Sequence, residues 1–158
     1  MHDRGGDGID PSKAWMCRVP AVVPRAGDVR CRLALMLGWI MAAGALGTGA
    51  RYLVGLWAID RFGTAFPYGT MIVNLVGCFV LGAVAHVATA SAWSPELRSA
   101  VVIGFLGGFT TYSSFNQDTL TLLSNGSTGA AFVNVAITFT AGLAAGWLGL
   151  VAARQLVA

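Results

Sequence analysis

Four long apolar runs alternate with short polar segments along the chain, and their lengths indicate the class of fold. The runs cover about residues 33–58, 69–90, 95–123 and 128–153. A helix needs about 20 mainly apolar residues to cross the hydrocarbon core of a bilayer. Each run is long enough to cross it, so the sequence predicts an all-α membrane protein with four transmembrane helices.

The third run contains a segment that disfavours a regular helix, with the sequence GFLGGFTTYSSF over residues 104–115. Glycine has low helix propensity, and threonine hydroxyls can bond nearby backbone carbonyls. A carbonyl freed inside hydrocarbon must find another partner, such as protein, water or an ion. We therefore expect the third helix to be broken near residues 107–111, with carbonyls available to a cation.

Local signals mark the ends of the third and fourth helices. Ser94 is a good N-cap, Pro95 suits the first helical position, and Glu96 places an acid in the first turn. The segment 125–128 reads NGST and predicts a tight loop before the fourth helix. Gly142 and Gly146 form a GxxxG pair, which predicts a helix contact and offers a face for pairing between chains.

Composition and charge separate the chain into an arm and one membrane domain. The 158 residues are 56% hydrophobic and only 11% charged, against about 25% charged in soluble domains. Residues 1–32 lack periodicity and predict a disordered basic arm, and residues 33–158 are expected to form one four-helix transmembrane domain. The arm is either an extension or the product of an upstream start, with Met36 or Met16 as the initiator. Its basic residues indicate a juxtamembrane segment rather than a nucleic-acid surface, and they are Arg4, Lys13, Arg18, Arg25, Arg30 and Arg32.

The polar side chains inside the runs are rich in hydrogen-bond donors and carry no catalytic pattern. There is no Cys/His cluster, no pair of carboxylates and no nucleophile beside a base, so we expect no enzyme activity. Amides, hydroxyls and the positive edges of aromatic rings can replace the water shell of a small anion. The set comprises Arg51, Thr70, Asn74, Thr110, Thr111, Tyr112, Ser113, Ser114, Asn134 and Thr138.

Each of these residues also has an ordinary structural interpretation. Asn74 could hold two helices together, and Tyr112 and Phe115, three apart on one helical face, could be core aromatics. Arg51 could extend to the membrane surface instead of facing an aqueous vestibule. Asp118 fits either a water-filled mouth or the exposed end of a helix. The residue types alone leave these alternatives open.

Three segments resemble the motifs of one family, the CrcB/Fluc fluoride channels. The 104–115 segment resembles the third-helix signature of that family. The segment GTMIVNLVG at 69–77 is similar to its second-helix motif, and GALGTGARY at 44–52 to its first. The likeness covers about residues 36–150 and is looser in the fourth helix.

This resemblance implies a passive fluoride-selective channel that exports fluoride across the cell membrane and relieves its toxicity. In a bacterium this membrane would be the inner membrane. It implies an antiparallel homodimer of two identical chains in lipid, with two pores. Gly107 and Thr110 would hold a structural sodium ion (Na+) through their backbone carbonyls. The residues expected along the fluoride pore are Asn74, Tyr112, Ser113, Ser114, Phe115, Asn134, Thr138 and, at a vestibule, Arg51.

The chain departs from the family pattern at two pore positions. Tyr112 stands where a phenylalanine is usual, and Asn134 stands where a tyrosine is usual. One hypothesis is that the hydroxyl has moved from the fourth helix to the third.

Two other functions remain open at this point. One is a small dual-topology multidrug exporter, although the first span lacks the acid that proton coupling needs. The other is a non-conducting assembly subunit, which would leave the donor-rich set without a role.

Overall fold

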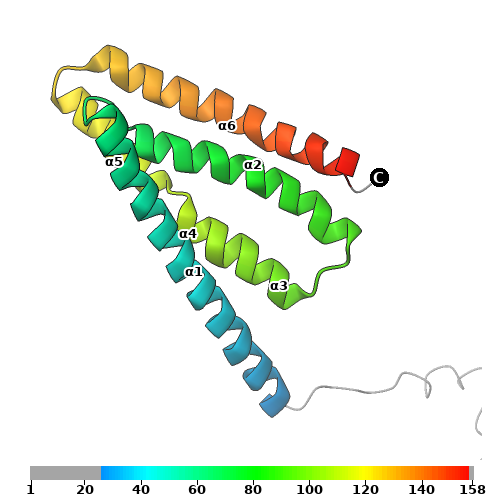
Figure 1. The fold of residues 1–158 in the computed structure, drawn as a ribbon. Coiled ribbons are helices and arrows are strands. Elements are labelled where there is room, and N and C mark those ends of the chain that lie inside the picture. The colour runs from blue at the N-terminus through cyan, green and yellow to red at the C-terminus, as the bar shows by residue number, and fades with distance from the viewer. Residues whose placement is uncertain (1–25, 157–158) are drawn as a thin grey trace, which may run out of the picture. The chain divides into compact units, whose positions relative to one another are not determined.

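The computed structural model describes residues 26–156, and those residues form helices joined by short loops, without a strand among them. Residues 1–25 of the predicted arm lie outside the described residues. Its last part, 26–32, is helical, so the first helix begins ahead of the predicted boundary. The elements are α1 (Ala26–Phe62), α2 (Tyr68–Ala90), α3 (Pro95–Ser99), the π-helix η3 (Ala100–Leu106), α4 (Gly107–Phe109), α5 (Tyr112–Ser124) and α6 (Thr128–Leu156) (Figure 1).

Three of the helices in the described part are long and apolar enough to cross a membrane. They are Arg32–Phe62, Tyr68–Ala90 and Thr128–Leu156. The predicted third span is absent from this set because its helical residues are divided among α3, η3, α4 and α5. The chain is therefore a multi-pass, all-helical membrane protein, as its apolar runs predict.

The predicted start of the third run is confirmed. The Ser94 hydroxyl accepts a hydrogen bond from the backbone N–H of Leu97 at 3.2 Å, and Pro95 occupies the first turn. Seven residues after α3 form the π-helix η3. Helical structure then stops at Phe109 and resumes at Tyr112, with two extended threonines between them.

The connection between α5 and α6 is a tight turn of three residues, 125–127. Gly126 adopts a φ of +74°, a conformation that favours glycine. The N–H groups of Asn125 and Gly126 donate to carbonyls in the last turn of α5, at 3.1 and 3.0 Å. So short a connection makes α5 and α6 antiparallel neighbours, and the two helices are in contact.

Helices α2 and α6 lie side by side (Figure 1) and share an extensive contact, in which glycines allow the two backbones to come close. A Cβ atom added to Gly82 would collide with the carbonyl of Gly146, and one added to Gly149 would collide with the carbonyl of Phe79. Each helix therefore lies with backbone against backbone at these points. Close approach of this kind is how membrane helices gain packing energy in the absence of a hydrophobic driving force.

The GxxxG pair of α6 belongs to the same contact. A Cβ on Gly142 would lie 3.7 Å from the Cys78 sulfur, and one on Gly146 would lie 3.5 Å from the Cys78 carbonyl oxygen. The predicted helix contact is therefore confirmed. The same face is occupied by α2 of its own chain, so it is not a free face for a second copy, contrary to our expectation. A sequence pattern identifies a close-packing face but not the helix that will cover it.

A second glycine contact joins α1 to the third run. A Cβ on Gly104 would lie 2.7 Å from the carbonyl oxygen of Ile40, and one on Gly108 would lie 2.5 Å from that of Gly44. Real Cβ atoms do not approach carbonyl oxygens so closely. Gly104 and Gly108 therefore set how near α1 comes to the segment in front of the two extended threonines.

We expect Gly149→Ala to lower the free energy of unfolding by about 1–3 kcal/mol, because the added methyl must displace the backbone of α2 at Phe79. The measurement is the thermal unfolding midpoint of the purified protein in detergent. Gly129→Ala on the same helix is the matched control, because nothing lies within 4 Å of its Cβ position. Equal midpoints for the two variants would show that α2 and α6 do not meet here.

The outward surfaces of α1 and α6 are apolar. Trp39 and Met41 on α1 and Phe132 and Leu143 on α6 are all exposed. An exposed apolar surface of this extent fits hydrocarbon or another membrane helix rather than water.

Candidate functional site

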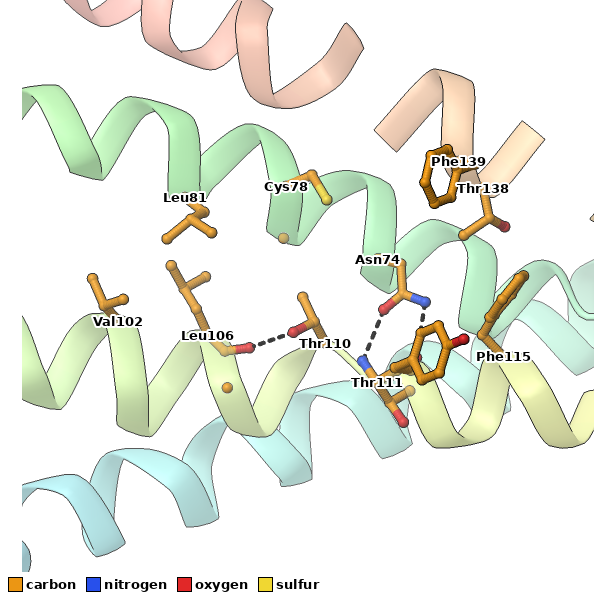
Figure 2. A pocket seen from close by; sticks show the side chains of 13 residues that line it. Asn74, Cys78, Leu81, Val102, Leu106, Thr110, Thr111, Phe115, Thr138 and Phe139 are labelled. Atoms are coloured by element: carbon orange, nitrogen blue, oxygen red, sulfur yellow. Dashed lines mark hydrogen bonds between the residues drawn. The ribbon is translucent and has the colours of Figure 1, made fainter. Parts of the chain in front are cut away.

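Asn74 and Thr111 form the centre of the site. The Asn74 amide nitrogen Nδ2 donates to the Thr111 carbonyl at 3.0 Å, and its oxygen Oδ1 accepts from the Thr111 N–H at 2.8 Å (Figure 2). One side chain of α2 thus satisfies both backbone groups of a residue between α4 and α5. Gly77, one turn further along α2, allows this approach, because a Cβ there would collide with the Thr110 methyl group.

The two threonines have extended backbones, with ψ of 158° at Thr110 and 119° at Thr111. In a continuous helix the Thr111 N–H would donate to the Gly107 carbonyl, and the Ser114 N–H would donate to the Thr110 carbonyl. Here the first N–H donates to Asn74, and the second donates to the Thr111 hydroxyl at 3.1 Å. The carbonyls of Gly107 and Thr110 therefore lose the donors that a helix supplies.

The Thr111 side chain caps the N-terminus of α5. Its hydroxyl accepts from the Ser114 N–H and lies 3.1 Å from the Ser114 hydroxyl and 3.2 Å from that of Ser113. Threonine is a favoured residue at this helix position. The first N–H groups of α5 carry partial positive charge, as at any helix N-terminus. The three hydroxyls and the helix end together form a donor-rich point inside the apolar protein.

A cavity of about 450 Å³ lies beside this point, between α2, α6 and the third run. The part of this cavity away from Thr111 is apolar, and there Leu81 and Cys78 of α2 lie across from Val102 and Leu106 (Figure 2). Six of the ten predicted site residues line it, namely Asn74, Gly107, Thr110, Tyr112, Phe115 and Thr138.

A second cavity, of about 310 Å³, lies on the other side of Thr111. Arg51 and Ser114 line it, and Thr111 lines both cavities. The Arg51 guanidinium donates through Nη1 to the Thr110 carbonyl at 3.4 Å, a long bond that still directs the positive charge inward. Arg51 therefore points at Thr110, between α4 and α5, rather than extending to the membrane surface.

The aromatic pair predicted from its spacing is in contact. The rings of Tyr112 and Phe115 have centroids 5.7 Å apart and planes inclined at 46°. Phe115 is half-buried, whereas Tyr112 is 79% exposed. Thr138 of α6 lines the 450 Å³ cavity across from Phe115 of α5 (Figure 2). The buried hydroxyl oxygen of Thr138 has no hydrogen-bond partner in the described protein.

Two predicted site residues, Ser113 and Asn134, lie outside the walls of both cavities. Ser113 is exposed beside the cap of α5. Asn134 is only 1% exposed, and its Nδ2 donates to the Thr119 hydroxyl of α5 at 2.9 Å.

Asp118 lies one turn beyond Phe115 and faces a different cavity, of about 500 Å³, near the turn between α5 and α6. Its carboxylate oxygen Oδ2 is buried and has no hydrogen-bond partner in the described protein. This placement favours the interpretation of a mouth lined by polar groups over that of an exposed helix end.

Sequence reasoning missed the part played by Thr111. The sequence held one signal for it, because a threonine directly before a polar helical segment is a common N-cap. It also missed Phe139, which lines the 450 Å³ cavity from α6 beside Thr138. No residue pattern indicated that α6 would turn this ring toward α2.

These features define the class of the protein as a small multi-pass helical membrane protein, with polar groups gathered where helical structure stops between its long spans. The sequence profile of the family described as "CrcB-like protein, Camphor Resistance (CrcB)" matches residues 38–150. The chain belongs to this family, as its three motifs predict.

Individual relatives match over almost their whole length. A protein of Sorangium cellulosum named Fluoride-specific ion channel FluC is 50% identical over 121 residues, which cover 76% of this chain and 95% of the relative. Proteins with the same name from Geobacter sp. (strain M21) and Acidobacterium capsulatum are 46% and 41% identical. Each match covers 76% of this chain, with 98% and 97% of the relative.

Proposed function

We propose that the chain is a passive fluoride-selective channel that exports fluoride across the cell membrane of a bacterium and so relieves its toxicity. The observation that carries this proposal is the 50% identity, over 95% of its length, to a relative named as a fluoride-specific ion channel. The relatives are named as channels rather than enzymes or multidrug exporters. The geometry around Thr111 supports the same function.

The groups that would bind fluoride are donors without fixed negative charge. Asn74 Nδ2 has two hydrogens and uses one on Thr111, so the second is free to face an anion. The Thr138 hydroxyl and the ring edge of Phe115 line the same cavity. In a site of low dielectric these dipoles replace hydration water, and the Arg51 charge attracts anions to the adjoining cavity.

The test is fluoride efflux from liposomes that contain only this protein, followed with a fluoride-selective electrode. Potassium-loaded vesicles with valinomycin and no proton gradient provide the driving force. We expect rapid fluoride efflux and no chloride efflux above that of empty vesicles. Efflux that requires a proton gradient, or equal loss of both ions, would contradict a passive selective channel.

We further propose a structural sodium ion at the carbonyls of Gly107 and Thr110. The N–H groups that would bond these two carbonyls in a helix donate instead to the side chains of Asn74 and Thr111. Carbonyl oxygens left without donors in a dry setting suit a hard cation. The Thr110 oxygen has two lone pairs, so the long bond from Arg51 leaves one for the ion. Sodium bound here would hold the two ends of the interruption together and would not itself be transported.

We expect sodium to raise the thermal unfolding midpoint of the purified protein, relative to the same concentration of the bulky cation N-methyl-D-glucamine. A ligand that binds only the native state stabilises it by mass action, by about 2.7 kcal/mol at 100 times its Kd. An equal midpoint in both salts would mean that no cation binds to these carbonyls.

We propose that the functional unit is an antiparallel homodimer in lipid. One chain supplies only two carbonyls, fewer than a hard cation gathers, and the same two carbonyls from a second copy would raise the number of oxygen ligands to four. The 450 Å³ cavity also has an exposed aromatic, Tyr112, that a second chain would cover. The apolar outer faces of α1 and α6 provide surface for lipid and for the second copy.

Antiparallel pairing predicts that the chain inserts in both orientations when its charge bias is small. Arg98 and Arg154 would lie on one side of the membrane and Arg61 on the other, a nearly even balance. Arg30 and Arg32 shift the balance toward one orientation.

We therefore expect both orientations for a chain that starts at Met36, measured by membrane-impermeant labelling of Ser127→Cys in a chain free of other cysteines. The full chain is the comparison. A single orientation for the shorter chain would contradict the antiparallel homodimer.

A further inference from the structure

We propose that Asn134 and Thr119 form a positioning pair that fixes the rotation of α5, and thereby keeps the Phe115 ring in the anion cavity. The inference rests on the proposed fluoride function. It assigns to Asn134 a role different from the pore-side one that the family resemblance implied, and it assigns a role to Thr119, which the sequence did not single out.

The pair is a relay of two hydrogen bonds that ends at Phe115. Asn134 Nδ2 donates to Thr119 Oγ1 at 2.9 Å, and Thr119 Oγ1 donates to the Phe115 carbonyl at 2.8 Å. The hydroxyl has one hydrogen, so it can donate only once, and the amide supplies the bond that it accepts. The link therefore runs from α6 to the backbone of the pore-lining aromatic residue.

Burial makes this relay costly to break. Asn134 is 1% exposed, so its amide cannot exchange the Thr119 hydroxyl for bulk water. A buried donor that is left without a partner loses its whole hydration energy. The hydroxyl of Thr140 shows the contrast, because it bonds the Ala136 carbonyl of its own helix and is exposed, without a partner on another helix.

The rotation of α5 affects the anion site because side chains from successive turns of this helix line different cavities. Phe115 lines the 450 Å³ cavity of the anion site, and Asp118 lines the 500 Å³ cavity with a buried oxygen that has no partner. Residues three apart are separated by about 60° around a helix. A modest rotation of α5 would withdraw the positive ring edge and turn a carboxylate toward the anion, which repels it at low dielectric.

The test compares single-channel fluoride conductance and the fluoride-to-chloride permeability ratio of full-length variants. Thr119→Val keeps the shape and removes the hydroxyl, and Asn134→Leu removes the amide at similar volume. We expect each to lower conductance about fivefold to tenfold, since a buried hydrogen bond is lost, and to lower the permeability ratio. Their combination should lower conductance no further than either alone, within about twofold, because the two residues act as one unit.

Two controls separate positioning from stability. Thr119→Ser restores the hydroxyl and should return both quantities to the parent values. Thr140→Val removes a hydroxyl that bonds only within α6 and should change neither. A purely structural contact would reduce the number of active channels without altering the conductance or selectivity of each one. That result, or effects of the two variants that multiply in the combination, would overturn the proposal.

A second readout does not depend on conduction. A 4-fluorophenylalanine at position 115 should give one fluorine NMR resonance in the parent and in Thr119→Ser, and a shifted or divided resonance in Thr119→Val and Asn134→Leu. An unchanged resonance in the last two would overturn the proposal even if conductance fell. If the parent conducts no fluoride, the proposed function fails, and the resonance alone decides the positioning role.

Discussion

Asn74→Asp is expected to abolish fluoride efflux, with a loss of at least about 100-fold, because it acts on the anion and on the backbone at once. Asn74 now donates to the Thr111 carbonyl at 3.0 Å and accepts from the Thr111 N–H at 2.8 Å. Aspartate keeps the acceptor but sets a second oxygen against the carbonyl. It also adds a negative charge where the permeant anion must pass.

The control for this prediction is Asn74→Ala, which removes both hydrogen bonds and adds no charge. We expect a smaller loss than with aspartate, so the difference between the two efflux rates isolates the effect of the charge. The measurement is electrode-monitored efflux at matched protein density, with size-exclusion profiles to verify folding. Efflux by Asn74→Asp within about twofold of the parent would mean that Asn74 only holds the helices together.

Phe115→Ile is expected to stop conduction, because it removes the aromatic edge from the wall of the 450 Å³ cavity. The edge of a ring carries positive charge that an aliphatic side chain lacks, although both are apolar. We expect fluoride efflux at the level of empty vesicles. Loss of the ring is more severe than loss of a hydroxyl, so Tyr112→Phe should keep selectivity and reduce only the rate.

Phe132→Ile is the matched control, because Phe132 is an exposed aromatic on α6 and lies outside the walls of both cavities beside Thr111. It should conduct like the parent. If Phe115→Ile conducts as well as Phe132→Ile does, the Phe115 ring does not contact the anion.

The parts of the fold that depend on local chemistry were predictable from the sequence. The Ser94 cap, the second span near residues 69–90 and the start of α6 at Thr128 all match, because they follow from residue type and hydropathy within a few positions. The apolar span within α1 begins at Arg32, close to the predicted residue 33, although the helix itself begins at Ala26. Hydropathy locates the apolar part of a helix, but after Pro24 nothing in residues 26–32 prevents the helix from beginning earlier.

The parts of the site that depend on which helices meet were not predictable. The sequence left open whether Asn74 joins two helices or lines a pore, and it did not indicate Thr111 as its partner, because the two residues are 37 positions apart. The contact of Asn134 with Thr119 depends on how α5 and α6 are rotated against each other. A one-dimensional pattern gives the face of a helix, and only packing decides what that face touches.

The three-residue turn between α5 and α6 has a consequence for how the chain folds during insertion. Closing a short loop costs little chain entropy, and contacts close in sequence form early. The Asn134–Thr119 contact spans only 15 residues, so the α5–α6 hairpin can assemble as soon as both helices have left the translocon. The orientation of the Phe115 ring would then be set while this hairpin forms, through the Asn134–Thr119 contact.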